Sequence, residues 1–196
     1  MTIKKLLLSG DQARTYINEL ASLRLDVFYE YPYLYEGTLE YEKNYLETYF
    51  KAKHAFILIL KDDDKVIGAT TGIWANEEEE SFKAPFTRFG INPEEVFYFG
   101  ESVLLKEYRG QGLGKIFFEE RERYARSLSF IKYLAFCAVQ RSEHPLEPKN
   151  YRPLDSFWES QAFKKIDGLT TTYHWRDRGE ENETNKLMQF WIKEIK

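Results

Sequence analysis

Apolar residues recur along this 196-residue chain with two different periods. Spacings of three or four residues predict helices, over residues 9–28, 38–50, 112–128 and 154–162, with a shorter one around 82–89. Short apolar runs bounded by turn residues predict strands, over residues 2–8, 54–60, 65–75, 96–105, 131–139, 163–176 and 186–195. The order predicts an α+β fold with early antiparallel hairpins and one strand–helix–strand unit.

Composition narrows the class of protein. Hydrophobic residues make up 43% and charged residues 31% of the chain, as in ordinary globular proteins. A net charge of -4 provides no basic field for nucleic acid. The single cysteine, Cys137, cannot form an internal disulfide, and the apolar run 55–60 is too short to span a bilayer. We expect one cytoplasmic domain over residues 1–196, without a nucleic-acid or membrane partner. The scattered histidines match no metal-site spacing.

Three glycines, Gly110, Gly112 and Gly114, precede the 112–128 helix and directly follow Arg109. A helix start has unpaired backbone N–H groups and a partial positive charge, and glycine lets an anion approach them closely. The spacing fits neither the dinucleotide fingerprint nor the P-loop, in which serine or threonine would replace Ile116, so another nucleotide-binding family is disfavoured. The loop therefore either binds phosphate or simply joins a strand to a helix.

The pattern Arg-x-x-Gly-x-Gly resembles the acetyl-CoA pyrophosphate loop of the GNAT N-acetyltransferase superfamily. The preceding ESVLLKEY and the later FWESQAF (residues 157–163) are similar to the family's fourth strand and late helix. The resemblance covers nearly the whole chain. It implies a GNAT-type single domain with a central mixed, mostly antiparallel sheet of about seven strands, flanked by about four helices. It also implies that acetyl-CoA is bound by Val103, Leu104, Leu105, Arg109, Gly110, Gln111, Gly112, Leu113, Gly114, Lys115 and Trp158.

Within this set the resemblance assigns separate tasks. The backbone of Val103 and Leu105 would hold the pantetheine arm by strand addition. The N–H of Val103 would also stabilise the oxyanion, and residues 110–115 would bind the pyrophosphate. Trp158 occupies a position where family members often have a tyrosine that protonates the thiolate. Because an indole N–H is not a practical acid, Tyr151 or solvent would have to replace it.

Acetylation of an amine also needs a base, because alkyl amines are mostly protonated at neutral pH. We predict that Glu101 is this base, and the alternative is that Glu101 pairs with a lysine or arginine in the sheet. Cys137 is expected to be a small core residue.

The loop YPYLYEG is a candidate wall for the acceptor, in which Tyr31, Tyr33 and Tyr35 would contact the substrate. Its tyrosines could equally pack on the domain, with Pro32 stiffening the loop. Arg141 and Arg152 are candidates to contact an acidic group on the acceptor or the cofactor phosphates.

The sequence therefore predicts an acetyl-CoA-dependent N-acetyltransferase that acts on a primary amine of a small molecule in a ternary complex, without a metal. The alternative is a non-catalytic acyl-CoA-binding or sensing module, which Trp158 motivates. The chain is expected to be a monomer or homodimer. The acceptor and the length of the acyl group stay open.

Overall fold

The computed structural model describes residues 3–78, 80–141 and 143–196, and a seven-stranded sheet runs through them. The strand order is β1-β2-β3-β4-β5-β7-β6. Neighbouring strands are antiparallel except β4 and β5, which are parallel. In chain order the elements are β1 (Ile3–Leu8), α1 (Gly10–Arg14), α2 (Ile17–Phe28), α3 (Leu39–Lys51), β2 (Phe56–Asp62), β3 (Lys65–Trp74), α4 (Glu80–Arg88), β4 (Val96–Leu104), α5 (Leu113–Ser127), β5 (Tyr133–Val139), α6 (Asp155–Ser160), β6 (Lys164–Trp175) and β7 (Thr184–Glu194).

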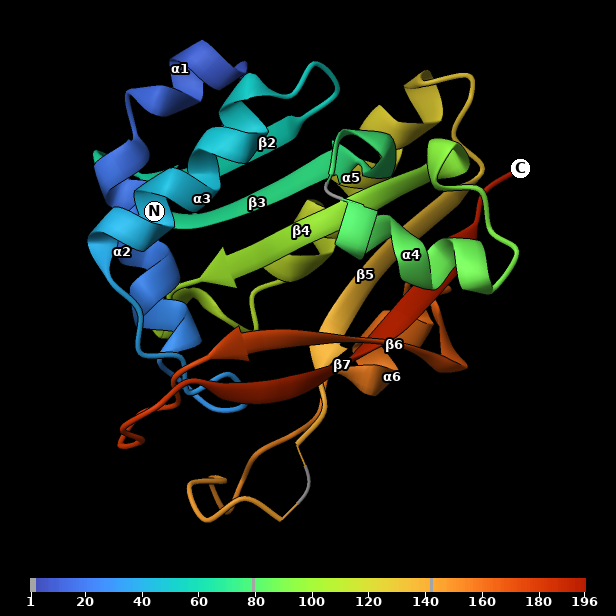
Figure 1. Ribbon diagram of the computed structural model, residues 1–196. Coiled ribbons are helices and arrows are strands. Elements are labelled where there is room, and N and C mark those ends of the chain that lie inside the picture. The colour runs from blue at the N-terminus through green and yellow to red at the C-terminus, as the bar shows by residue number, and fades with distance from the viewer. Residues whose placement is uncertain (1–2, 79, 142) are drawn as a thin grey trace.

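Helices cover both faces of the sheet (Figure 1). Helices α2 and α3 contact the strands from one face, where α2 packs on β3 and β4. Helix α5 packs on β2, β3 and β4 from the other face, and the Phe118 ring of α5 meets the Phe157 ring of α6 at 5.3 Å. The resulting core is rich in phenylalanine, tyrosine and tryptophan. Across the part of the chain that the structure describes, every helix is too short or too polar to cross a membrane.

The predicted mixed α+β sheet of seven strands is confirmed, and the described residues form six α-helices rather than about four. The first predicted helix divides into α1 and α2 at Thr15 and Tyr16. The start of α3 follows its sequence signal, since the Thr38 side chain accepts a hydrogen bond from the Tyr41 N–H. The acidic segment before β4 holds α4.

Two irregularities of β4 shape the centre of the molecule. Its pairing with β5 covers only three residue pairs, the last of which joins Tyr98 to Ala135. Its pairing with β3 contains a bulge, where Gly100 and Glu101 stand opposite the single residue Thr71. Beyond Tyr98 the two parallel strands therefore separate, and the bulge lies at the mouth of the gap.

Candidate active site

The start of α5 presents an open row of backbone donors. Gly112 is the N-cap residue with φ 81°, and Gly110 has φ 75°, so both positions favour glycine. Within the described residues, the N–H groups from Gly110 to Gly114 have no hydrogen-bond acceptor. Converging unpaired N–H groups at a helix start form an anion site. These open donors support the proposal that the loop binds a pyrophosphate, which stays a prediction.

Gly114 differs from the other two glycines. Its φ is not positive, and a Cβ there would meet only the Phe157 ring, at 3.8 Å. The protein itself therefore gives no steric reason for glycine at this position. A ligand lying against the backbone would give one.

The Arg109 side chain does not face this row of donors. Its guanidinium donates two hydrogen bonds to the Glu30 carboxylate, at 2.8 and 2.9 Å, and Nε donates to the Leu104 carbonyl at 2.9 Å. This bidentate pair ties the loop to the segment after α2. Three of the five N–H groups of the guanidinium are engaged in this way, and binding of the cofactor by Arg109 stays a prediction.

The open edge of β4 belongs to different residues from those predicted. The Leu105 N–H donates to the Ile67 carbonyl at 2.9 Å, so it faces β3. Backbone groups alternate between the two sides of a strand, which places the Val103 groups on the β3 side as well. Ser102 and Leu104 then face the gap toward β5. Assigning the pantetheine arm and the oxyanion to Val103 and Leu105 was wrong by one residue, whereas Leu104 remains a candidate.

Glu101, the predicted base, projects from the bulge into a buried charge cluster. Its Oε2 lies 2.6 Å from Nη1 of Arg24 on α2, and the Arg24 Nε also pairs with Glu42 of α3. Burial alone would lower the pKa of Arg24, but the charges of Glu101 and Glu42 outweigh it and raise that pKa. Glu101 therefore pairs with an arginine, although from a helix rather than from the sheet. Its role as a base stays a prediction.

Tyrosine hydroxyls surround Glu101 on the same face. The Tyr45 hydroxyl lies 3.5 Å from the Glu101 carboxylate and 3.0 Å from the Tyr49 hydroxyl, both on α3. On β4, the Tyr98 hydroxyl lies 3.1 Å from the Cys137 thiol of β5. Desolvation raises the pKa of all three hydroxyls, so they stay protonated at neutral pH. Tyr45, Tyr49, Tyr98 and Glu101 are called the tyrosine cluster below, and Tyr49, Tyr98 and Glu101 are buried.

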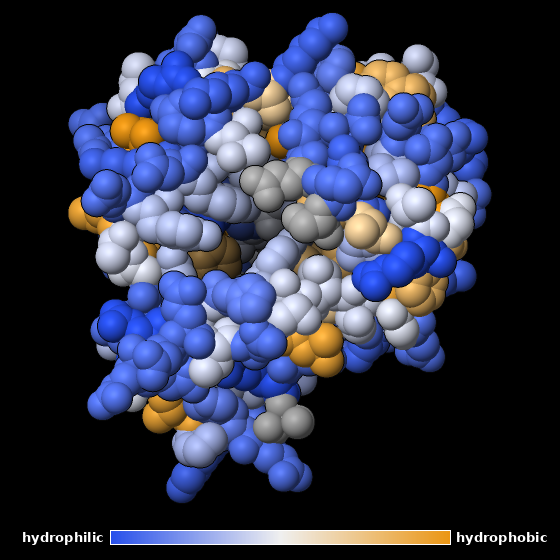
Figure 2. Space-filling view, viewed as in Figure 1, coloured by the Kyte–Doolittle hydropathy of each residue, from blue (hydrophilic) through white to orange (hydrophobic). Residues whose placement is uncertain are grey.

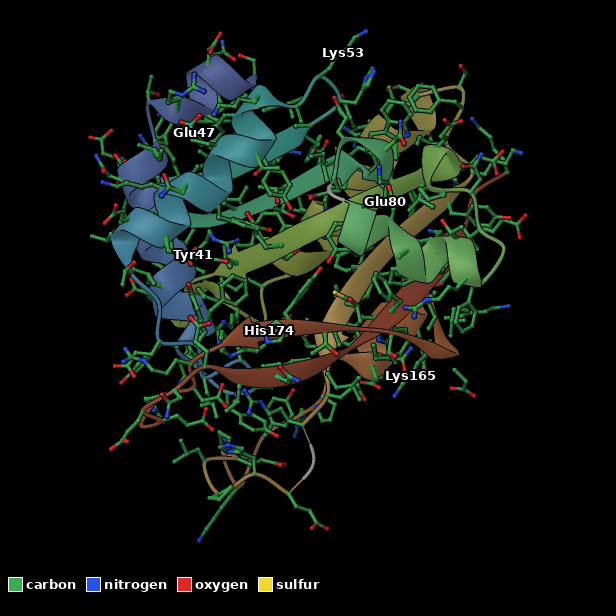
Figure 3. The ribbon with its side chains drawn as sticks, in the orientation of Figure 1. Tyr41, Glu47, Lys53, Glu80, Lys165 and His174 are labelled. Carbon is green, nitrogen blue, oxygen red and sulfur yellow. The ribbon has the colours of Figure 1, made fainter. Side chains whose placement is uncertain are left out.

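The surface is hollowed over this part of the sheet (Figure 2). In the side-chain view, the labelled Glu80 of α4 and His174 of β6 lie on opposite sides of β4 (Figure 3). Burial raises the pKa of the Cys137 thiol to about 11, so it is mostly protonated there. This favours a small buried side chain over a nucleophile.

The three tyrosines of the YPYLYEG loop pack largely on the protein. The Tyr31 hydroxyl donates to Glu147 at 3.0 Å. The Tyr33 ring lies 5.9 Å from the Trp175 ring, and Tyr35 forms a β-bridge with Asp177. Tyr35 also lines a cavity of about 270 Å³. Contact between these tyrosines and an acceptor stays a prediction.

A buried ion cluster fixes this loop to the β6–β7 hairpin. Arg141 donates to the Asp177 carboxylate from Nη2 at 2.7 Å and to the Pro32 and Tyr33 carbonyls at 2.8 and 2.9 Å. Lys186 lies 2.9 Å from the same carboxylate. The expectation that Arg141 contacts the acceptor or the cofactor phosphates is wrong, because the loop and Asp177 occupy its donors.

Trp158 does not reproduce a tyrosine acid. Its ring is partly buried and packs against the aromatic core, 5.1 Å from the Phe136 ring and 5.1 Å from the Trp191 ring. Tyr151, the predicted substitute, packs edge-on against Tyr31 at 4.6 Å. The α6 position thus serves packing.

Sequence reasoning missed Arg24, Glu42 and Arg121, which are all at least 90% buried. Each lies on the apolar face of a helix. Arg24 directly follows buried Leu23, and Arg121 stands one turn after Phe117. A charge inside an apolar stripe was the available signal, because such a charge needs a buried partner.

Comparisons with known proteins agree with this geometry. The acetyltransferase (GNAT) family matches residues 18–147, more than half of the chain. A search among curated proteins finds no match. The chain therefore belongs to the GNAT acetyltransferase family, whose members use acetyl-CoA.

Solved structures share the fold over the full length. A ribosomal-protein-alanine N-acetyltransferase from Brucella melitensis has a TM-score of 0.63 at 14% identity, with 100% of both chains covered. An N-acetyltransferase from Staphylococcus aureus Mu50 has a TM-score of 0.64 at 13% identity, also with 100% of both chains covered. NAA60 from Arabidopsis thaliana, solved with acetyl-CoA, has a TM-score of 0.63 at 12% identity, with 99% of both chains covered. At these identities the likeness concerns the fold alone.

Proposed function

We propose that this acetyltransferase transfers the acetyl group of acetyl-CoA to a primary amine of a small molecule, by direct attack in a ternary complex. The observation that carries the proposal is the meeting of two features on β4. The open edge for the cofactor arm begins at Ser102, directly after the bulge residue Glu101, and the Glu101 carboxylate lies in the tyrosine cluster.

The chemistry of the tyrosine cluster suits a cationic acceptor that must lose a proton. Hydroxyls that stay neutral can accept hydrogen bonds from an ammonium group, and tyrosine rings attract a cation. Bound acetyl-CoA supplies an activated carbonyl and a thiolate leaving group. Tyr45 would pass the amine proton toward Glu101, because its hydroxyl lies 3.5 Å from that carboxylate. The backbone facing the gap at Ser102 and Leu104 would align the arm and stabilise the oxyanion.

Release of CoA thiol across a panel of mono-, di- and polyamines tests the proposal. We expect turnover with at least one amine and intersecting double-reciprocal lines for the two substrates. Glu101→Gln should lower kcat by about 100-fold, in the range of a lost general base. Tyr41→Phe, in which the exposed hydroxyl of another α3 tyrosine is removed, is the matched control and should leave kcat unchanged.

The paired state of Glu101 favours one other function. Accepting a proton would end the ion pair with Arg24, and the usual acid position holds Trp158 in the core. Both features suit a protein that binds acyl-CoA without turnover. Acetyl-CoA binding without CoA release from any amine, together with the same affinity in Glu101→Gln, would establish this function and overturn the first.

A further inference from the structure

Arg121 of α5 is a buried cation without a carboxylate partner. Its exposure is only 2%, and it forms no ion pair within the described residues. Its guanidinium lies 4.0 Å from the Phe99 ring centre and 4.9 Å from that of Phe118. Desolvation lowers the pKa of Arg121 from its ordinary value, which reflects the cost of burying this charge. A side chain kept at that cost needs a structural or functional reason.

All four hydrogen bonds of Arg121 lead to its own helix or to the bulge. Nη1 donates to the carbonyls of Thr71 and Glu101, at 3.3 and 3.2 Å. Nη2 donates to the Ser102 hydroxyl at 2.8 Å, and Nε donates to the Phe117 carbonyl at 3.3 Å. The guanidinium thus joins the two sides of the β3–β4 irregularity.

The bulge leaves backbone groups that the strand ladder cannot satisfy. The Glu101 carbonyl accepts from the Thr70 hydroxyl at 2.6 Å as well as from Arg121. The Glu101 N–H points to the Thr71 hydroxyl at 3.4 Å. Side chains therefore replace the missing ladder bonds, and Arg121 supplies the charged donor.

Glu101 is held from both faces of the sheet. Arg24 binds its carboxylate from the α2 face, and Arg121 binds its carbonyl from the α5 face. We infer that Arg121 is a positioning residue, which holds the bulge in the shape that turns Ser102 and Leu104 toward the gap and the Glu101 carboxylate toward Tyr45. The inference rests on the family's use of acetyl-CoA and, for Glu101, on the proposed function.

Binding of two ligands can show whether Arg121 positions the bulge or only stabilises the fold. Acetyl-CoA reaches both the glycine row and the β4 edge, whereas 3′-phosphoadenosine 5′-diphosphate lacks the pantetheine arm. Arg121→Met keeps an unbranched apolar side chain between the two phenylalanine rings but removes every donor. For Arg121→Met, calorimetry should show a dissociation constant for acetyl-CoA that is raised by about tenfold or more, as expected for a lost charged hydrogen bond. The dissociation constant for the nucleotide should be unchanged. Arg121→Lys should recover part of the loss.

Arg123→Met is the matched control, since Arg123 is an exposed arginine of the same helix that pairs with Glu120. It should change neither affinity. If Arg121→Met does not fold, Thr70→Val can be used instead, because it removes the other donor to the Glu101 carbonyl. It should weaken the binding of acetyl-CoA and leave the binding of the nucleotide unchanged.

An unchanged affinity for acetyl-CoA, or an equal loss for both ligands, would overturn the inference. Failure of the proposed function would give a different result, since the wild-type protein would then bind acetyl-CoA but release no CoA with any amine. The ratio of the two affinities would still decide the role of Arg121 in that case.

Discussion

Replacing Gly114 with alanine should make the protein more stable and bind acetyl-CoA less well. The residue lies in the first turn of α5 without a positive φ, and a new Cβ would be 3.8 Å from its nearest neighbour, an ordinary contact. Glycine in a helix costs up to about 1 kcal/mol relative to alanine. For a chain of this size, the melting temperature should therefore rise by about 2–4 °C.

The cofactor affinity should change in the opposite direction. A methyl group on Gly114 would occupy the space from which an anion approaches the N–H row. A hydrogen bond to a charged group contributes about 1.5–3 kcal/mol, so its loss raises the dissociation constant by about 10- to 100-fold. Gly112 is less informative, because its φ of 81° would strain any side chain and so confuse stability with binding.

Thermal melts and calorimetric titration with acetyl-CoA measure both quantities on the same preparation. Gly90→Ala is the control, since Gly90 also has open space around it but a φ of 72°. That variant should lose about 1 kcal/mol of stability and keep its affinity. A Gly114→Ala protein that binds acetyl-CoA as tightly as wild type would show that the pyrophosphate does not lie against this turn.

Three further predictions concern other parts of the structure. Burial opposes ionisation of Asp177, but hydrogen bonds from Arg141 and Lys186 outweigh it and lower the pKa of Asp177. The ionised carboxylate therefore stabilises the fold above the unfolded pKa of about 3.9, and this contribution is lost as the pH falls toward the folded pKa. Acid titration of Asp177→Asn should show a smaller pH dependence over that window, with about 3–5 kcal/mol lost at neutral pH. Cys137, with a pKa of about 11, should react with maleimide at pH 7 far more slowly than in urea-unfolded protein. Trp158→Tyr should cost about 1–3 kcal/mol in urea unfolding without raising kcat, since the ring is a packing element.

The sequence was most informative where the signal is local. Thr38 before an amphipathic run predicted the start of α3, and the glycines predicted a helix start with exposed donors. The assignment of Val103 and Leu105 came from the family resemblance, and it failed because a sequence motif does not show which side of a strand the backbone groups face. The side that the backbone groups of each β4 residue face is set by the pairing with β3, and in this strand the bulge shifts it.

Long-range partners were beyond the sequence for another reason. Glu101 was singled out, but Arg24 lies 77 positions earlier and reaches it only because α2 packs across β3 and β4. Nothing in the local pattern around either residue specifies that contact. The charges on apolar helix faces showed that partners must exist, without saying which.

The short seam between β4 and β5 divides the sheet into two halves, β1–β4 and β5–β7, that share three residue pairs. Side-chain packing outside the ladder also joins the halves, since the Phe82 ring of α4 packs against Tyr98 of β4 and Phe190 of β7. A ligand that spans the gap contacts both halves and couples their opening, so cofactor binding should make unfolding more cooperative as well as less frequent. Slower amide hydrogen exchange would then extend into β5 and β7, well beyond the residues that touch the ligand.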